Sequence, residues 1–544
     1  MAVNPVKTAF SNMTFAPDVP SSSLSANEYN AGYNVETDVR SVKSVLGEIP
    51  ILSTIPGHVI FVTGGFRAND IWWFIVATQE GVWYAIDDAG YTDISTGAVG
   101  YKGSGYSANI VITATWNGTV LFINDEINPP MYLLDTATTL RLYDYAPDYY
   151  VWNYDVGYNS SGNVVPLYSS LTAGFVRLYN SPNVGSLLVA GNLTGNIAAN
   201  VVPYGGTVQN LPTTIRWSQN FGLNAGPTTW APTNINIANA VEAPVRGPVI
   251  DGFPLNGNFY ICSYWDTVVL SPIAYQSTSV PVFGLKLMNQ GRGLLNENCW
   301  TNVDNSVYGV DARDIWQFDG GTFKPIGDQR VKNYFFANLN PSYVNQVFIV
   351  NNSAKYSIEI YYPDLTSTGR CNQMLSYRYD LDVWNPPRTV ASATMATESP
   401  RFVSNLANLA SRCVVYSNGS GNVSLLQKDT GTSFVGNTAI SSLFQRNNIS
   451  FGQPYSASVQ VHRVLPEVYG TGNVDITVGG SNSVAGNVTY KPTVSLPIVT
   501  ENPWVQINQN EARITTVKVA GNSAVDTWQM SAANWQITIV QDTR

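Results

Sequence analysis

The chain has 544 residues, which exceeds the size at which one compact core keeps growing, so it needs several domains or an architecture that extends by adding modules. Charged residues make up 12% of the chain and aromatic residues another 12%, with a formal charge of −9. The net negative charge and the absence of a basic cluster argue against a protein that binds nucleic acid through contacts to its phosphates. The sequence also has no apolar run long enough to span a membrane, and its polar first thirty residues or so predict no secretory signal.

Residues 1–56 predict an extended N-terminal arm. The segment is irregular, with Pro5, Pro17 and Pro20 and a run of serines at 21–23. Long arms at a terminus stay disordered or pack against a neighbouring subunit. Apolar side chains at Phe10, Met13 and Phe15 favour an arm that packs along a neighbouring subunit.

Residues 57–449 predict a β-propeller. A unit of an apolar strand, an Asp, a tight turn and a returning strand recurs at 82–91, 131–135, 315–323 and 425–429. A single hairpin cannot bury its apolar face, so many copies must stack around a shared core. Helical periodicity is nearly absent. We therefore expect an all-β chain whose propeller has six to eight blades, at about 40 to 50 residues per blade.

Two further regions differ from the rest of the chain in composition or in expected strand length. Residues 145–206 are rich in Asn, Gly and Tyr and predict a loop-rich insert that carries contacts. Residues 450–544 have longer strands, in which Trp535, Ile537 and Ile539 share one face. We expect this C-terminal β region to form either a small sandwich or strands that close the propeller.

Few residues suggest chemistry. The cysteines Cys262, Cys299, Cys371 and Cys413 lie too far apart in sequence for a metal motif, so we interpret them as buried free thiols of a protein folded in a reducing cytoplasm. His58 and His462 have no partner motif. We expect no metal, no cofactor and no catalytic residue.

Paired carboxylates raise one enzymatic alternative, a propeller glycoside hydrolase. The candidate pairs are Asp87 with Asp88, Asp311 with Asp314, and Asp380 with Asp382. Each pair sits where a strand turns, and Asp is favoured there because its side chain caps the turn backbone. We therefore interpret these carboxylates as turn caps.

Other patterns have a structural interpretation as well. The segment 103–108 superficially resembles a dinucleotide loop but precedes no helix, so we expect a turn. Segment 218–222 with Trp230 is only loosely like the Asp-box of sialidases. Several aromatic side chains could stack on sugars, although blade-core packing is the simpler use: Trp72, Trp73, Trp152, Tyr149 and Tyr150.

A longer pattern resembles a known family. It runs through 214–218, 230–232, 252–272, 281–284, 291–299 and 310–330, with its Asp-Gly-Gly turn, and includes 27–30 and 514–544 at the two ends of the chain. These segments resemble the tail nozzle, also called tail tubular protein B, and the tail-hub stabilisation proteins of short-tailed bacteriophages.

The resemblance implies a structural virion protein that is not an enzyme. It implies a homo-oligomeric ring, a hexamer, that lies below the adaptor or tail tube protein, surrounds the DNA exit channel and docks tail fibres or spikes. DNA would pass through without sequence-specific binding, which agrees with the net negative charge. The alternatives are the glycoside hydrolase and a sugar-binding receptor-recognition protein of the virion.

Overall fold

The structure is a computed structural model. It describes residues 4–67, 71–95, 105–107, 109–135, 140–144, 152–273, 282–400, 413–419, 421–430, 434–435, 438–451, 457–483, 486–499, 503–521 and 526–541. These residues form mostly antiparallel strands joined by turns, with a short α-helix, α2 (Lys332–Asn338). No helix among them has the length and apolarity needed to cross a lipid bilayer.

Five four-stranded antiparallel sheets follow one another from residue 59 to residue 325. Blade one has β8 (Val59–Phe66), β9 (Trp72–Thr78), β10 (Trp83–Asp87) and β11 (Gly90–Asp93). Blade two has β12 (Thr113–Asn117), β13 (Val120–Asn124), β14 (Met131–Asp135) and β15 (Leu140–Asp144). Blade three has β18 (Tyr168–Ser181), β19 (Gly185–Ile197), β20 (Val208–Trp217) and β21 (Asn239–Glu242). Blade four has β22 (Val249–Leu255), β23 (Asn258–Ser263), β24 (Asp266–Ile273) and β25 (Val282–Gln290), and blade five has β26 (Trp300–Val303), β27 (Ser306–Val310), β28 (Ile315–Phe318) and β29 (Phe323–Pro325).

A seven-stranded sheet supplies two more blades. Its strands are β30 (Phe348–Asn352), β31 (Ser357–Tyr362), β32 (Cys371–Arg378), β33 (Val383–Glu398), β34 (Val414–Asn418), β35 (Val423–Lys428) and β7 (Glu48–Ile55). The first half of β33 pairs with β32 and its second half with β34, so this long strand ends blade six and begins blade seven. The described residues therefore form a seven-bladed β-propeller, which confirms the expected fold class.

The first strand of each blade lies toward the propeller axis. β33 contacts β8, β12 contacts β18, and β18 contacts β22, so neighbouring blades meet through these strands. Close packing between blades depends on small residues facing large ones. A Cβ atom on Gly65 would lie 2.5 Å from Cζ2 of Trp116, so the indole of blade two fills the space that this glycine leaves on blade one.

The propeller is closed by a strand from the N-terminal segment. β7 pairs antiparallel with β35 as the outermost strand of blade seven. The sequence had suggested the C-terminal region as one source of closing strands, but that region forms a separate sandwich. A chain end brought in to complete the last blade ties the two ends of the propeller together, because opening the ring requires breaking that pairing.

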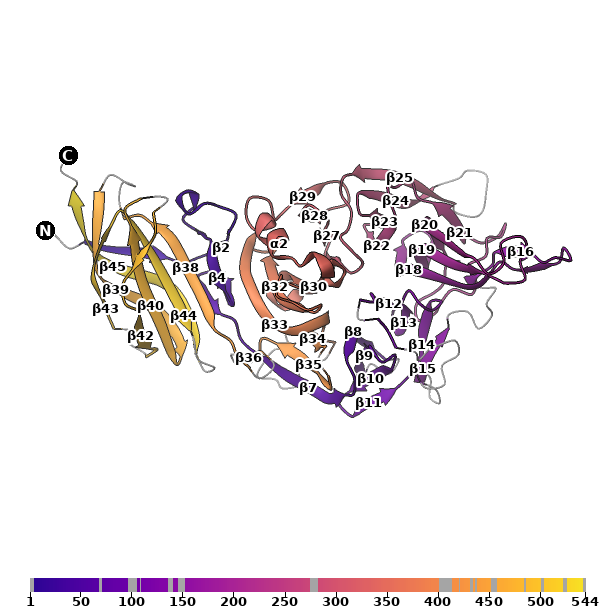
Figure 1. The fold of residues 1–544 in the computed structure, drawn as a ribbon, viewed down its shortest axis with the longest axis horizontal. Helices are drawn as coiled ribbons and strands as arrows, with labels where there is room; N and C mark the ends of the chain where they lie inside the picture. Colours follow the sequence, from indigo (N-terminus) through magenta and orange to yellow (C-terminus); the bar gives the residue numbers. More distant parts are fainter. Residues whose placement is uncertain are drawn as a thin grey trace.

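The sandwich has two six-stranded sheets that share an apolar core. The first contains β43 (Val505–Ala512), β39 (Ala457–Thr471), β45 (Thr527–Gln541), β6 (Ser41–Ser44), β5 (Val35–Asp38) and β1 (Asn4–Ala9). The second contains β4 (Ala31–Tyr33), β38 (Ser442–Ile449), β44 (Ile514–Gly521), β40 (Asn473–Ser481), β41 (Thr489–Tyr490) and β42 (Val494–Pro497). Figure 1 shows the sandwich at one end of an elongated molecule, with both chain termini on it.

The N-terminal segment differs from the expectation that it lies along a neighbouring subunit. Phe10, Met13 and Phe15 are buried within their own chain, and β1 pairs with β45 from Asn4↔Ile537 to Ala9↔Ala532. A short parallel pair, β2 (Thr14–Phe15) and β3 (Glu28–Tyr29), continues the segment. Apolar anchors in a sequence show that a segment packs, but they do not show on which copy of the chain it packs.

The expected insert is more regular than its composition suggests. Residues 145–151 lie outside the described residues, but the rest forms a hairpin of β16 (Val156–Tyr158) and β17 (Val164–Pro166) and the outer parts of β18 and β19. Figure 1 shows this hairpin projecting from blade three at the end of the molecule opposite the sandwich. The remaining short elements are η1 (Ser21–Ser23), η2 (Pro341–Gln346), η3 (Ser353–Lys355), β36 (Phe434–Val435) and β37 (Thr438–Ala439).

Candidate functional site

The carboxylates of Asp311 and Asp314 are brought together, as a hydrolase would require, but they are bound to a cation. Arg292 reaches both of them, at 3.2 Å each. The Oδ1 of Asp311 also accepts the backbone N–H groups of Arg313 and Asp314 at 2.7 and 2.8 Å. Burial raises the pKa of Asp311 despite these donors. The pair closes a turn and holds an arginine, so no free acid and base face each other here.

The other two candidate pairs are also turn residues. The carboxylate of Asp382 forms an ion pair with the guanidinium of Arg330 at 3.0 Å, and that of Asp380 forms one with Arg378 at 2.7 Å. Each carboxylate of that turn therefore has its own arginine. Asp87 accepts the backbone N–H of Ala89 at 2.8 Å, and Asp88 follows it in the turn between β10 and β11. Asp87 thus caps its turn as expected, whereas Asp380 and Asp382 are held by arginine side chains.

Histidines and cysteines form no reactive cluster in the described part of the chain. His58 lies 2.6 Å from Glu80 at the surface, and His462 contacts the hydroxyl of Thr538 at 2.8 Å. The free thiols of Cys262, Cys299 and Cys371 are buried, and Cys413 is partly buried. Burial raises the pKa of the Cys262 thiol to about 12, so it stays protonated. No group of three potential metal ligands occurs among the described residues.

The aromatic residues that were candidates for sugar stacking are mostly internal. Trp73 and Trp152 are buried, and the rings of Trp152 and Trp230 meet edge to face with centroids 4.7 Å apart. Such pairs stabilise a core. Trp72 lies partly buried against Phe74. Tyr149, Tyr150 and half of the 103–108 segment, namely Gly103, Ser104 and Ala108, fall outside the described residues.

A cavity of about 360 Å³ lies on the propeller axis and is here called the axial cavity. It is lined by residues of the first strands of several blades: Arg177, Asn298, Trp300, Thr301, Asn302, Ile349, Val350, Asn351, Met395 and Glu398. Its volume is within the range of small-molecule sites, roughly 300–1,000 Å³. Among the described residues, Glu398 is the one acid in this lining, and its Oε1 accepts the backbone N–H of Ser353 at 2.6 Å.

The wall of the axial cavity is fixed by a buried ion pair. Arg177 donates to both carboxylate oxygens of Asp251, at 2.9 and 2.6 Å, and its guanidinium lies 5.1 Å from the ring centroid of Trp300. The indole N–H of Trp300 donates to the same carboxylate at 2.7 Å. Sequence reasoning missed this group. The available signal was a single arginine in the middle of the apolar strand that became β18.

Two glutamates of the propeller, Glu297 and Glu126, have strongly raised pKa values. Burial, followed by the charge of Glu126, raises the pKa of Glu297 to about 8. Burial, followed by the charge of Asp125, raises the pKa of Glu126 to about 7. Glu297 lines a second cavity of about 30 Å³, which has room for about two waters and no sugar ring.

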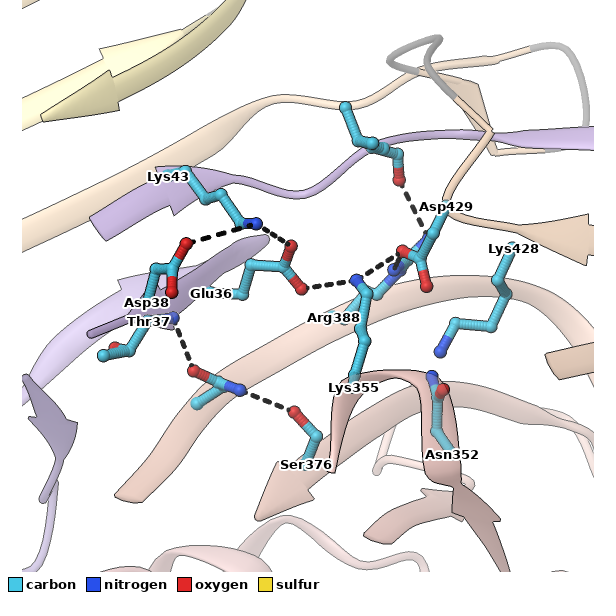
Figure 2. A network of polar contacts seen from close by, with 12 residues as sticks. Glu36, Thr37, Asp38, Lys43, Asn352, Lys355, Ser376, Arg388, Lys428 and Asp429 are labelled. Atoms are coloured by element: carbon cyan, nitrogen blue, oxygen red, sulfur yellow. Dashed lines mark hydrogen bonds and ion pairs between the residues drawn. The ribbon is translucent and has the colours of Figure 1, made fainter. Parts of the chain in front are cut away.

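The strongest concentration of charge lies between the sandwich and blades six and seven. This set, the junction network, comprises Glu36, Lys43, Glu48, Lys355, Glu359, Arg388, Lys428 and Asp429. Figure 2 shows Lys355 between Glu36 and Asp429, and Arg388 also reaches Asp429. The distances are 2.6 Å for Glu36 to Lys355, 2.9 Å for Lys355 to Asp429 and 2.7 Å for Arg388 to Asp429.

Lys355 and Asp429 hold each other ionised. Burial lowers the pKa of Lys355, but Asp429 and Glu36 outweigh it and raise that pKa above its usual value. Burial raises the pKa of Asp429, but Lys355 and Arg388 outweigh it and hold it well below its usual range. The network borders a polar cavity of about 230 Å³. The sequence singled out Asp429 as the turn residue of the 425–429 unit, but not its charged partners, because they lie in distant segments of the chain.

Comparisons with known proteins identify no family. No protein-family model and no curated protein matches the chain. Among solved structures, the chain is similar to YCF48 from Cyanidioschyzon merolae, at 10% identity and a TM-score of 0.36, over 71% of this chain and 99% of that one. It is also similar to a glycoside hydrolase family 43 arabinoxylan arabinofuranohydrolase from Bacillus subtilis, at 10% identity and a TM-score of 0.22, over 97% and 99%. Neither similarity bears on activity.

Proposed function

We propose that this chain is a structural protein of the virion, the tail nozzle or hub of a short-tailed phage. The observation that carries the proposal is the set of connections between its two parts, the propeller and the sandwich. The sandwich takes strands from both chain ends, and β7 follows the sandwich strand β6 in the chain and enters blade seven. The ion pair of Glu36 in the sandwich with Lys355 in blade six joins the two parts directly. Such connections suit a structural protein that forms the wall of a channel and has no substrate to convert.

The sequence resemblance supplies the assembly. The segments that resemble nozzle and hub proteins fall mainly in blades three, four and five, with 27–30 just before the sandwich strand β4 and 514–544 containing β44 and β45. In this proposal the chain forms a homo-oligomeric ring, a hexamer, below the adaptor or tail tube protein, and tail fibres or spikes dock on it. Rings arise when unlike faces of identical subunits meet and the rotation closes.

Charge supports a channel through which DNA passes. Each subunit carries a formal charge of −9, and several such subunits around an axis repel DNA instead of retaining it. The free buried thiols are consistent with folding in the host cytoplasm before assembly into the virion tail.

The axial cavity favours a second candidate, a sugar-binding or sugar-cleaving virion protein. Its volume and its lining of one indole and several amides suit a small polar ligand. Retaining and inverting glycosidases, however, need two carboxyl groups on opposite sides of the bond. In the part of the chain that the structure describes, the axial lining offers the carboxyl group of Glu398 alone, so recognition fits the cavity better than hydrolysis.

Electron microscopy of the purified chain and of virions, with an antibody to this chain, tests the main proposal. We expect a ring at the tail, and no reducing sugar released from host surface polysaccharide. A monodisperse monomer that releases sugar, with activity abolished by Glu398→Gln, would contradict the proposal. Asp311→Asn serves as the control, because it is expected to weaken folding through its turn without a specific effect on turnover.

A further inference from the structure

Blade three differs from the rest of the surface in charge. Between Asp155 and Glu242 the sequence has two charged side chains, Arg177 and Arg216. Both are buried, and they pair with Asp251 and Asp155 at 2.6 and 2.5 Å. Every other residue of 156–241 is uncharged, in a protein with a formal charge of −9. The surface formed by residues 156–241 therefore presents no ionised side chain, and the exposed Glu242 lies just beyond it at the end of β21, whereas typical protein surfaces are about a quarter to a third charged.

Apolar side chains project from the end of this blade. The blade-three projection consists of β16, β17 and residues 198–208, and Figure 1 shows its hairpin at the tip farthest from the sandwich. Six of its apolar side chains are more than half exposed: Val156, Tyr158, Val164, Val202, Tyr204 and Val208. Single exposed apolar residues are ordinary, but a cluster on one projection marks an interaction surface.

The absence of charge indicates which partner covers the projection. Interfaces between unlike proteins commonly use complementary charges to steer association, and residues 156–241 offer none on the surface. Two copies of an acidic chain repel each other, so a face without ionised side chains lowers that repulsion on one side of the contact. Interface centres are likewise depleted of charge and enriched in tyrosine.

We propose that the blade-three projection is a surface through which one copy of this chain binds a second copy. The inference rests on the proposed ring, and it assigns one of the two faces that such a ring requires. Because ring contacts join unlike faces, the projection would seat on a different surface of the neighbouring copy.

Sedimentation velocity on the full-length chain tests this directly. We compare the wild type with Val202→Asp and Tyr204→Asp, which place a charge on the projection. Leu365→Asp is the matched control, because Leu365 in blade six is 61% exposed, as against 66% for Tyr204. All four proteins should unfold at the same temperature, since these side chains lie at the surface. A photoreactive p-benzoylphenylalanine in place of Tyr204 reports what the projection touches.

We expect the wild type and Leu365→Asp to self-associate equally, while each projection variant weakens association roughly tenfold or more. The photoreactive variant should cross-link to a second copy. Unchanged association of both projection variants, equal loss in the control, or a wild type that stays monomeric without a cross-linked dimer would overturn the inference. If a tail ring is seen by microscopy but the projection variants still form it, the inference fails while the proposed function stands. If no tail ring is seen, the proposed function fails, whichever surface self-associates.

Discussion

The ammonium nitrogen of Lys355, in η3 of blade six, lies 2.6 Å from the carboxylate Oε2 of Glu36, in β5 of the sandwich. The same nitrogen lies 2.9 Å from Oδ1 of Asp429, the residue that follows β35 of blade seven. One lysine thus joins three segments that are far apart in the chain. Since each ion is largely removed from water, the geometry is favourable only while all three partners are in place. This contact fixes how the sandwich sits on the propeller.

Replacing Lys355 with methionine should therefore destabilise the protein. Glu36 and Asp429 would keep their negative charges at the junction with less compensation, and we expect a loss of about 2–3 kcal/mol in the free energy of unfolding, somewhat below the cost for a fully buried pair because Lys355 is partly exposed. Urea unfolding at neutral pH measures it. The control is Lys7→Met: Lys7 pairs with Glu467 at the same 2.6 Å but is 56% exposed, so its loss should cost under about 1 kcal/mol. Equal costs for the two variants would show that the junction network adds nothing beyond a surface pair.

Lys428 offers a deeper version of the same test. Its ammonium lies 2.6 Å from Oε2 of Glu359, and both side chains are almost wholly buried. Asn352 and Tyr361 also donate to that carboxylate, at 2.7 and 2.9 Å. Lys428→Met leaves Glu359 buried without its cation, so we expect a loss of about 3–5 kcal/mol.

The double variant Lys428→Met with Glu359→Gln should recover part of that stability, because the amide keeps an acceptor for Asn352 without a buried charge. A thermodynamic cycle of the single and double variants, measured by urea unfolding, gives the coupling. Additive losses would contradict the assigned pairing of Lys428 with Glu359.

The sequence allowed the blades to be predicted but not their ionic connections. Alternating apolar residues and Asp-containing turns are local signals, so the strands on either side of Asp319 could be expected, and its carboxylate does cap the turn at Gly321. The junction network has no local signal, because Glu36, Lys355 and Asp429 meet only once the propeller has closed. Arg177 likewise gains its partner Asp251 from the next blade. The closure by β7 was missed for the same reason, because two strands that pair across so long a stretch of chain produce no local sequence pattern.

Glu297 should make stability depend on pH. Its pKa in the folded protein is raised to about 8, chiefly by burial and next by Glu126. Below the unfolded pKa, about 4.5, both states are protonated and the group contributes nothing. As pH rises from there to about 8, the unfolded state ionises first, so folding loses stability across that window.

Glu297→Gln removes this titration, so the variant should gain stability relative to the wild type as pH rises from 5 to 8. The measurement is the unfolding free energy of both proteins at several pH values in that range. Glu242→Gln, at an exposed position of β21, is the control and should run parallel to the wild type. Parallel curves for Glu297→Gln as well would mean that this carboxyl is fully solvated in the folded protein.

Phe10 tests whether the N-terminal segment belongs to its own chain. Its side chain is 1% exposed, and its ring meets Phe444 of β38 edge to face with centroids 5.3 Å apart. Phe10→Ala should cost about 3–5 kcal/mol, because it leaves a cavity between the two sheets of the sandwich. Phe66→Ala, at a position in β8 that is 37% exposed, should cost much less. If the segment packs within one chain, the stability difference between Phe10→Ala and the wild type is the same at every protein concentration. A difference that grows or shrinks with concentration would place Phe10 on a neighbouring copy instead, since an anchor between copies contributes through mass action.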